Sequence, residues 1–295
     1  MVHPLIAQHI QAAKEIGRGG VLPAEKAAAL EALTQQMGEM PKINMNVRFE
    51  GDESSSPAII KFDTNELPVS QVRLETACAE LVNNVREQIA NRVDGYNPEL
   101  LKMTPVTKVR DGDGVALKRF DIFKDSDGKL EKKRIVSAAS LMGVEPSAKA
   151  KDLTHNAASY PEVTKMLNEV TGKNHGAEMF TRMMTNLCIN NNDDHLGNQA
   201  VMCRRDGTEP ELTPVYDCVS QPAWGGSLKV AIGPFGLEGT PDNIALSAKE
   251  MGLSDQAARV IAEAAIEATK DWKEVFKSHG LSEKDCQYYE RDIEF

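Results

Sequence analysis

Three polar side chains in two separate segments have the types and the order that magnesium-dependent phosphoryl transfer requires. The run NNNDDHLGN at 190–198 places Asp193 before Asn198, and LTPVYD at 212–217 ends on Asp217. In such a reaction one carboxylate accepts or orients a proton, while an amide oxygen and a second carboxylate hold the magnesium ion that bridges the phosphates. We therefore expect Asp193 to have the first role, and Asn198 and Asp217 the second.

The polar run at 190–198 has a second interpretation. It follows an apolar helical pattern at 176–189, and consecutive Asn and Asp residues compete with helical hydrogen bonding, so a loop is predicted. Such a loop is also typical of a solvated helix end with Asn in left-handed geometry. The later Asp217 favours catalysis, because protein kinases present a catalytic-loop Asp and Asn and then a metal-binding Asp in this order.

The elements expected to position these residues are rich in strands before about residue 120 and mainly helical after it. Alternating apolar and polar residues predict a strand at 42–50, and further strands are expected at 58–62, 104–109 and 114–120. The first two are joined by the turn-forming GDESSSP and indicate a hairpin, and a helix is predicted at 69–92. After Phe120 a short strand pair is expected near 199–203 and 212–215, and the remainder is predicted to be helical.

This order of elements indicates an α+β fold in which a cleft separates a strand-rich part from a helical part. We expect a helical N-terminal segment at 1–37, a small strand-rich lobe at 38–120 and a larger helical lobe at 121–295.

Composition excludes several classes of protein. The chain has 295 residues and a net charge of −10, which makes it a poor general binder of nucleic acid or anionic membranes. It has no apolar run long enough to span a membrane and no recognisable signal peptide. The five cysteines are scattered without a CxxC pair, which predicts free thiols and a cytoplasmic location.

Several ordered segments resemble the HipA-like serine/threonine kinases. TNLCINNNDDHLGNQ and LTPVYD are similar to the catalytic region of that family, and MGEMPK at 37–42 is similar to its phosphate-binding loop. AIIKF at 58–62 resembles the strand with the ATP-contacting lysine, and LKRFD at 117–121 resembles the hinge. The resemblance covers most of residues 38–290. It implies a two-lobed protein-kinase-like fold with ATP and Mg2+ as cofactors.

The resemblance also implies a role for each matching residue. Asp193 would be the catalytic base with Asp194 as the weaker candidate, and Asn198 and Asp217 would hold magnesium. The ATP-binding residues would be Gly38, Lys42, Lys61, Glu75, Lys118 and Phe120.

Some of these charges also have ordinary interpretations. Lys61 and Glu75 are compatible with unrelated surface charges, although a lysine inside the apolar run AIIKF requires a partner, for which Glu75 is expected. Lys42 beside a strand start is compatible with a solvated side chain. His195 is expected to be a structural hydrogen-bonding residue, because no second histidine stands at zinc-ligand spacing.

The chain departs from the family pattern in two places. Full-length members carry a folded subdomain before the phosphate loop, which implies here a reduced subdomain or a small partner protein that replaces it. The family's inhibitory autophosphorylated serine aligns with Gln35, so inhibition through that serine is expected to be absent.

The resemblance implies a toxin of a toxin–antitoxin system. Its substrate would be a translation component such as an aminoacyl-tRNA synthetase, and its antitoxin a helix-turn-helix protein. Two alternatives remain on the same scaffold: a kinase of a small molecule or lipid, and an inactive nucleotide-binding pseudokinase.

Overall fold

The computed structural model describes residues 42–49, 51–63, 68–93, 96, 103–109, 112–125, 127–144, 159–204, 206–222 and 228–290. The predicted helical segment 1–37, together with Gln35 and the phosphate-loop residue Gly38, lies outside the described residues.

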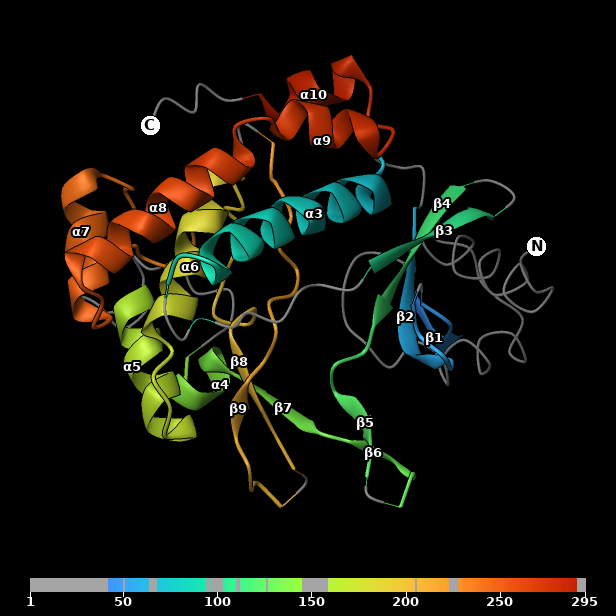
Figure 1. Cartoon of the computed structure of the whole chain (residues 1–295), viewed down its shortest axis with the longest axis horizontal. Helices are drawn as coiled ribbons and strands as arrows, with labels where there is room; N and C mark the ends of the chain where they lie inside the picture. Colours follow the sequence, from blue (N-terminus) through green and yellow to red (C-terminus); the bar gives the residue numbers. More distant parts are fainter. Residues whose placement is uncertain are drawn as a thin grey trace.

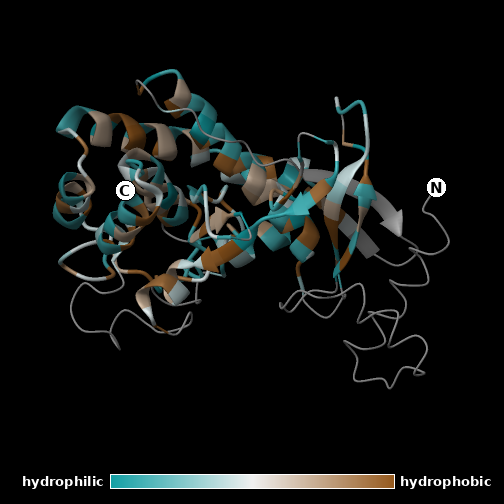
Figure 2. Ribbon diagram, turned by 90° about the horizontal axis from the view of Figure 1, so that it is seen from below, coloured by the Kyte–Doolittle hydropathy of each residue, from teal (hydrophilic) through white to brown (hydrophobic). Residues whose placement is uncertain are grey.

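A four-stranded antiparallel sheet forms one end of the molecule (Figure 1). In spatial order its strands are β1 (Lys42–Val47), β2 (Ser56–Phe62), β4 (Gly112–Lys118) and β3 (Met103–Val109). The predicted hairpin is confirmed, because β1 and β2 pair in antiparallel register with Lys42 opposite Lys61. Figure 2 shows apolar residues recurring along these strands, as the alternating sequence pattern predicts.

The alternation along β2 decides which way its lysine faces. Ala58, Ile60 and Phe62 are buried and pack with Ile43 and Ala116 in one apolar cluster. Successive strand residues point to opposite faces, so Lys61 projects from the face away from this cluster.

Helix α3 (Gln71–Ala90) follows the hairpin and lies between the sheet and the remaining helices in Figure 1. Its first turn is capped by Ser70, whose hydroxyl accepts a hydrogen bond from Arg73 N. The Asp63 carboxylate accepts hydrogen bonds from Ser70 Oγ and Val72 N, which joins the end of β2 to the start of the helix. The angle between the two elements that carry Lys61 and Glu75 is thus set locally.

The segment after Phe120 contains strands that the sequence pattern did not predict. They are β5 (Ile122–Lys124), β6 (Leu130–Lys132) and β7 (Arg134–Ser137), and β7 is followed by the short helix α4 (Ala138–Met142). β6 is fully exposed, so it has no buried face to produce an alternating pattern. β7 forms its hydrogen bonds with β8, far along the chain, and such tertiary pairing leaves little local signal.

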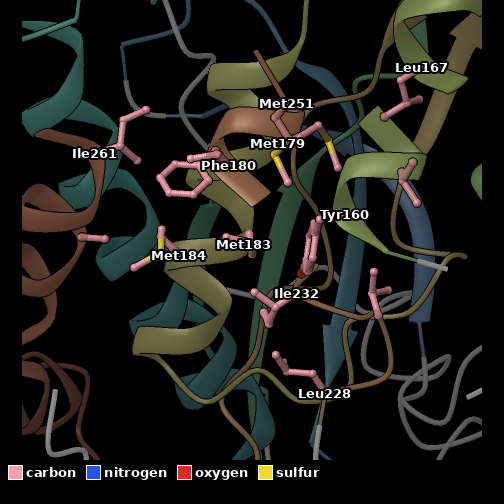
Figure 3. Packing of buried hydrophobic residues seen from close by; sticks show 14 of the residues in the cluster. Tyr160, Leu167, Met179, Phe180, Met183, Met184, Leu228, Ile232, Met251 and Ile261 are labelled. Atoms are coloured by element: carbon pink, nitrogen blue, oxygen red, sulfur yellow. The ribbon is translucent and has the colours of Figure 1, made fainter. Parts of the chain in front are cut away.

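Helices dominate the other end of the molecule, as predicted. They are α5 (Tyr160–Thr171), α6 (Gly176–Cys188), α7 (Pro241–Glu250), α8 (Asp255–Thr269), α9 (Trp272–Ser278) and α10 (Glu283–Tyr289). The predicted strand pair is present as β8 (Ala200–Cys203) and β9 (Glu211–Leu212), with β7 as the third strand of that sheet. Figure 3 shows the core of this region, where Tyr160, Phe180 and Met183 pack near Ile232.

A second apolar cluster fixes α3 to the segment that carries Asp217. Leu74, Cys78 and Leu81 of α3 share this cluster with Val215 and Cys218. Ser220 N also donates a hydrogen bond to Cys78 Sγ over 3.3 Å. Helix α3 therefore has a defined position relative to Asp217, although the two are far apart in the sequence.

All five cysteines are buried free thiols, as predicted. Within the described ranges, no helix combines the length and the apolar character needed to cross a membrane.

Candidate active site

The polar run after α6 is a buried loop. Asn190 has a φ of 55°, the left-handed geometry that ends a helix, and Asn191 N donates to Asn186 O over 2.8 Å. The helix-end interpretation is therefore right about the backbone. This interpretation also implies solvated side chains, and it is wrong for Asn191 and Asn198, which are only 2% and 6% exposed.

Asp193 is the exception in this buried loop. Its side chain is 51% exposed and forms an ion pair with Lys229, whose Nζ donates to Asp193 Oδ1. Sequence reasoning missed Lys229. The signal that could have found it is the one used for Lys61: a single lysine within an apolar stretch, here SLKVAI at 227–232.

Asp194 points into the protein, in contrast to its neighbour. The Tyr160 hydroxyl donates to Asp194 Oδ2 over 2.5 Å, and Gln199 Nε2 donates to Asp194 Oδ1 over 3.0 Å. Burial raises the pKa of this carboxyl group, while the hydrogen bonds from Tyr160 and Gln199 oppose the shift. Its geometry is that of a residue that anchors the loop.

The two segments that carry Asn198 and Asp217 are joined through the residues that precede them. The Tyr216 hydroxyl donates to the carbonyl oxygen of Gly197 over 2.8 Å, which joins the residue before Asp217 to the residue before Asn198. His195 stabilises the same turn, since its Nδ1 accepts from Gly197 N over 3.1 Å. This is the structural role predicted for His195.

The side-chain amide of Asn186 also connects the loop that carries Asp193 with the segment that carries Asp217. Asn186 Oδ1 accepts a hydrogen bond from Asn191 Nδ2 over 3.0 Å and another from Cys218 Sγ over 3.1 Å. Asn186 Nδ2 in turn donates to Tyr160 Oη over 3.0 Å. Asn191 and Cys218, which lie close to Asp193 and Asp217 in the sequence, therefore both bond to the buried side chain of Asn186.

Asp217 has a left-handed backbone, with a φ of 58°. This conformation is uncommon for residues other than glycine, and Asp and Asn adopt it more readily than most. Backbone strain of this kind concentrates at functional sites. The Asp217 side chain is 59% exposed, and its Oδ1 lies 3.4 Å from Lys61 Nζ.

Lys61 links β2, α3 and Asp217. Its Nζ lies 2.6 Å from Glu75 Oε1, and the side chains of Lys61 and Glu75 are only 14% and 4% exposed. Burial lowers the pKa of Lys61, but the charges of Glu75 and Asp217 outweigh it and raise the pKa overall, so the lysine stays protonated. Lys42 lies opposite Lys61 in the pairing of β1 with β2. Burial lowers the pKa of Lys42, and the positive charge of Lys61 is the next cause.

The two predicted hinge residues are placed differently. Lys118 Nζ lies 2.6 Å from Asp52 Oδ2, so its side chain contacts the turn between β1 and β2 and not the Lys61 group. The Phe120 ring stacks on Tyr216 with ring centroids 5.8 Å apart, directly beside Asp217.

The side-chain oxygens on the two joined segments are of the type that magnesium accepts. The described residues contain no cluster of three or more His, Cys, Asp or Glu side chains that could hold a metal ion by themselves. Magnesium that binds together with a nucleotide needs fewer protein ligands. One or two protein oxygens are enough, because phosphate oxygens and water molecules occupy the other coordination positions. The amide of Asn198 and the carboxylate of Asp217 are the residues present that would fit this requirement.

Comparisons with known proteins point to one family. The family model of the HipA-like C-terminal domain matches residues 34–272. No curated protein sequence matched. A chain of the Shewanella oneidensis MR-1 toxin–antitoxin complex of HipA, HipB and operator DNA superposes with a TM-score of 0.58 at 15% identity, covering 95% of this chain and 67% of that one. The Helicobacter pylori proinflammatory kinase CtkA gives a TM-score of 0.47 at 10% identity, covering 83% and 94% respectively.

Proposed function

Because the chain belongs to the HipA-like C-terminal domain family and shares a mixed helix-and-strand, kinase-like fold with HipA, we propose that it is an ATP- and magnesium-dependent serine/threonine protein kinase. In this proposal the four-stranded sheet and α3 form the nucleotide lobe, and the helical end forms the second lobe.

One observation supports this proposal most strongly. Lys61 of β2 reaches both Glu75 of α3 and Asp217, with Nζ–oxygen distances of 2.6 and 3.4 Å. A lysine–glutamate ion pair next to a metal-binding aspartate is the arrangement that active protein kinases need. An inactive nucleotide-binding pseudokinase would also need the Lys61–Glu75 pair to bind phosphates, so the exposed Asp193 is the feature that favours an active kinase.

The proposed reaction uses four side chains. Lys61 binds the phosphates of ATP, while Asn198 and Asp217 would hold magnesium, which supplies positive charge against the phosphate oxygens. The acceptor hydroxyl forms a bond to the γ-phosphorus as the bond to ADP breaks, and its proton passes to the Asp193 carboxylate. Asp194 takes no part in this transfer, because its oxygens are occupied by Tyr160 and Gln199.

The proposed biological role follows from the family and from the HipA likeness. HipA is the toxin of a toxin–antitoxin system and forms a complex with HipB and operator DNA. We therefore propose that this chain is a toxin kinase bound by a helix-turn-helix antitoxin in the cytoplasm. Its substrate would be a translation component such as an aminoacyl-tRNA synthetase, and a small protein would be a further partner.

The test is transfer of label from γ-labelled ATP with magnesium into the proteins of a bacterial lysate. The wild-type protein is expected to label a protein band that an Asp193→Ala variant does not label, while both bind ATP. A labelled small molecule or lipid without any labelled protein would favour the alternative kinase class. ATP binding without transfer to any acceptor would contradict the proposed activity.

A further inference from the structure

We propose that Lys229 is a further catalytic residue, which binds the phosphoryl group during its transfer and holds the Asp193 carboxylate in position before it. The inference rests on the proposed kinase function and assigns to it a residue outside the set expected from the sequence.

The contact between Lys229 and Asp193 is made by a fixed segment of chain. Leu228 and Val230, on either side of Lys229, are buried in the same apolar core as Tyr160. The next residue, Ala231, accepts a hydrogen bond through its carbonyl oxygen from Tyr160 N over 2.9 Å. The backbone of Lys229 is therefore anchored on both sides, and its position differs from that of a lysine on a free surface loop.

The two segments joined by the hydrogen bond between Tyr160 and Ala231 also contact the two adjacent aspartates, Asp193 and Asp194. Tyr160 lies at the start of α5 and donates its hydroxyl to Asp194, while Lys229, two residues before Ala231, donates to Asp193. One acid is thus fixed by a buried neutral donor. The other is matched by a cation on the exposed side, where an acceptor hydroxyl and a phosphoryl group would meet.

The charges of the site divide into two groups. On the nucleotide side, Lys61 is bound to Glu75 and Asp217. Lys229 pairs with Asp193, and its side chain is 31% exposed, so its ammonium group can reach an incoming ligand. Because phosphoryl transfer spreads negative charge over the oxygens of the moving group, a cation beside the catalytic carboxylate stabilises the transition state.

Lys229 keeps its positive charge throughout the proposed transfer step. The bond between the acceptor oxygen and the γ-phosphorus forms, the bond from that phosphorus to ADP breaks, and the hydroxyl proton passes to Asp193. Lys229 stays protonated and moves its hydrogen bonds from Asp193 to the phosphoryl oxygens as the carboxylate takes up the proton.

The experiment compares Lys229→Met with Lys229→Arg and with Lys165→Met, which removes an exposed lysine of α5. The initial rate at which γ-labelled ATP labels the lysate band is measured over a range of ATP concentrations. Lys229→Met is expected to lower the maximal rate by about 100-fold or more, the loss typical of removing one donor to the transition state. The KM for ATP and the melting temperature stay close to wild type, since an exposed ion pair contributes little to stability.

Lys229→Arg, which keeps the positive charge, is expected to restore most of the rate, and Lys165→Met should behave as wild type. A Lys229→Met variant that is as fast as an active wild type overturns the inference and leaves the kinase function intact. A loss of rate that Arg does not rescue, with a parallel fall in ATP binding and melting temperature, also overturns it by showing a structural role. A wild type that transfers no phosphate refutes the proposed function, and this inference with it.

Discussion

Asp193 and Asp194 are adjacent in the sequence and have opposite environments. The Asp193 side chain is half exposed beside Lys229, whereas Asp194 is buried and accepts hydrogen bonds from Tyr160 and Gln199. Consecutive loop residues project in different directions, so one side chain can be exposed while the other anchors the loop. This difference supports the proposal that Asp193 takes part in the chemistry, while Asp194 supports the loop.

The left-handed backbone of Asp217 leads to a prediction that separates stability from activity. Asn also tolerates this geometry, so Asp217→Asn is expected to keep the wild-type melting temperature, while losing the carboxylate lowers magnesium-dependent turnover by roughly 100-fold. Asp217→Ala should lose turnover and also destabilise the fold by about 1 kcal/mol, because alanine adopts this conformation poorly. Thermal melts and labelling rates of both variants check this. Equal melting temperatures for the two would contradict the role of backbone geometry.

At the scale of elements, α3 holds together the part of the site for which nucleotide binding is proposed. It carries Glu75, is joined to β2 through Asp63 and packs through Cys78 against the segment after Asp217. A movement of this helix would therefore change the Lys61–Glu75 distance and the surroundings of Asp217 together.

The ion pair between β2 and α3 predicts a pH-dependent loss of stability in Lys61→Met. Without the lysine, Glu75 stays buried and its pKa, which burial already raises, rises further. The folded state then holds a proton that the unfolded state releases above its ordinary pKa of 4.5, so the stability of the variant falls as pH rises above 4.5. Urea unfolding over this range measures the effect relative to wild type. Lys61→Met/Glu75→Gln, which removes the ionisable group, should abolish this extra dependence on pH, and its persistence would contradict the assignment.

The start of α5 supports the catalytic loop through one hydroxyl group. Burial raises the pKa of Tyr160 well above its ordinary range, with the charge of Asp194 as the next cause, so the hydroxyl stays a neutral donor. Tyr160→Phe leaves Asp194 with one donor fewer and removes the acceptor of Asn186 Nδ2. We expect a loss of about 1–3 kcal/mol in the free energy of unfolding and a lower maximal rate with ATP binding retained. Urea unfolding and labelling rates test this, and an unchanged rate would show that the loop does not depend on Tyr160.

At the scale of the whole molecule, a chain of polar contacts joins α3 to the catalytic loop. Arg86 of α3 and Arg182 of α6 both bind Glu178. Arg182 Nη1 also donates to Gln199 Oε1 over 2.9 Å, and Gln199 donates to Asp194. The helix that positions Glu75 and the loop that positions Asp193 therefore share one buried network.

This network predicts where the protein loses stability in acid. Burial would raise the pKa of Glu178, but Arg86 and Arg182 outweigh it and lower the pKa from 4.5 to about 2. A carboxyl group with a depressed folded-state pKa stabilises the protein above its unfolded value, and this contribution disappears as pH falls from about 4.5 to about 2. Glu178→Gln should therefore be less stable than wild type near pH 7 and approach it near pH 3, as judged by urea unfolding midpoints. A constant difference between the two proteins at all pH values would contradict this role.

The sequence by itself determined the order of the elements and the identity of the polar residues at their ends. The hairpin, α3, α6 and the loop after it follow from local patterns of apolar residues, because strands and helices impose fixed periods on a buried face. The pattern of Asp193, Asn198 and Asp217 could also be recognised from the sequence, because all three residues lie within two short segments.

Only the tertiary structure decided which of these side chains are exposed and which contacts support them. Three contacts join residues that are distant in the sequence: Lys229 with Asp193, Tyr160 with Asp194, and Asn186 with Cys218. Their sequence separations are 36, 34 and 32 residues respectively. The strands β5, β6 and β7 were missed on related grounds, since they are short, partly exposed and, for β7, paired with a distant strand. Burial, pKa and side-chain direction depend on the packing of such distant segments, and no local period encodes that packing.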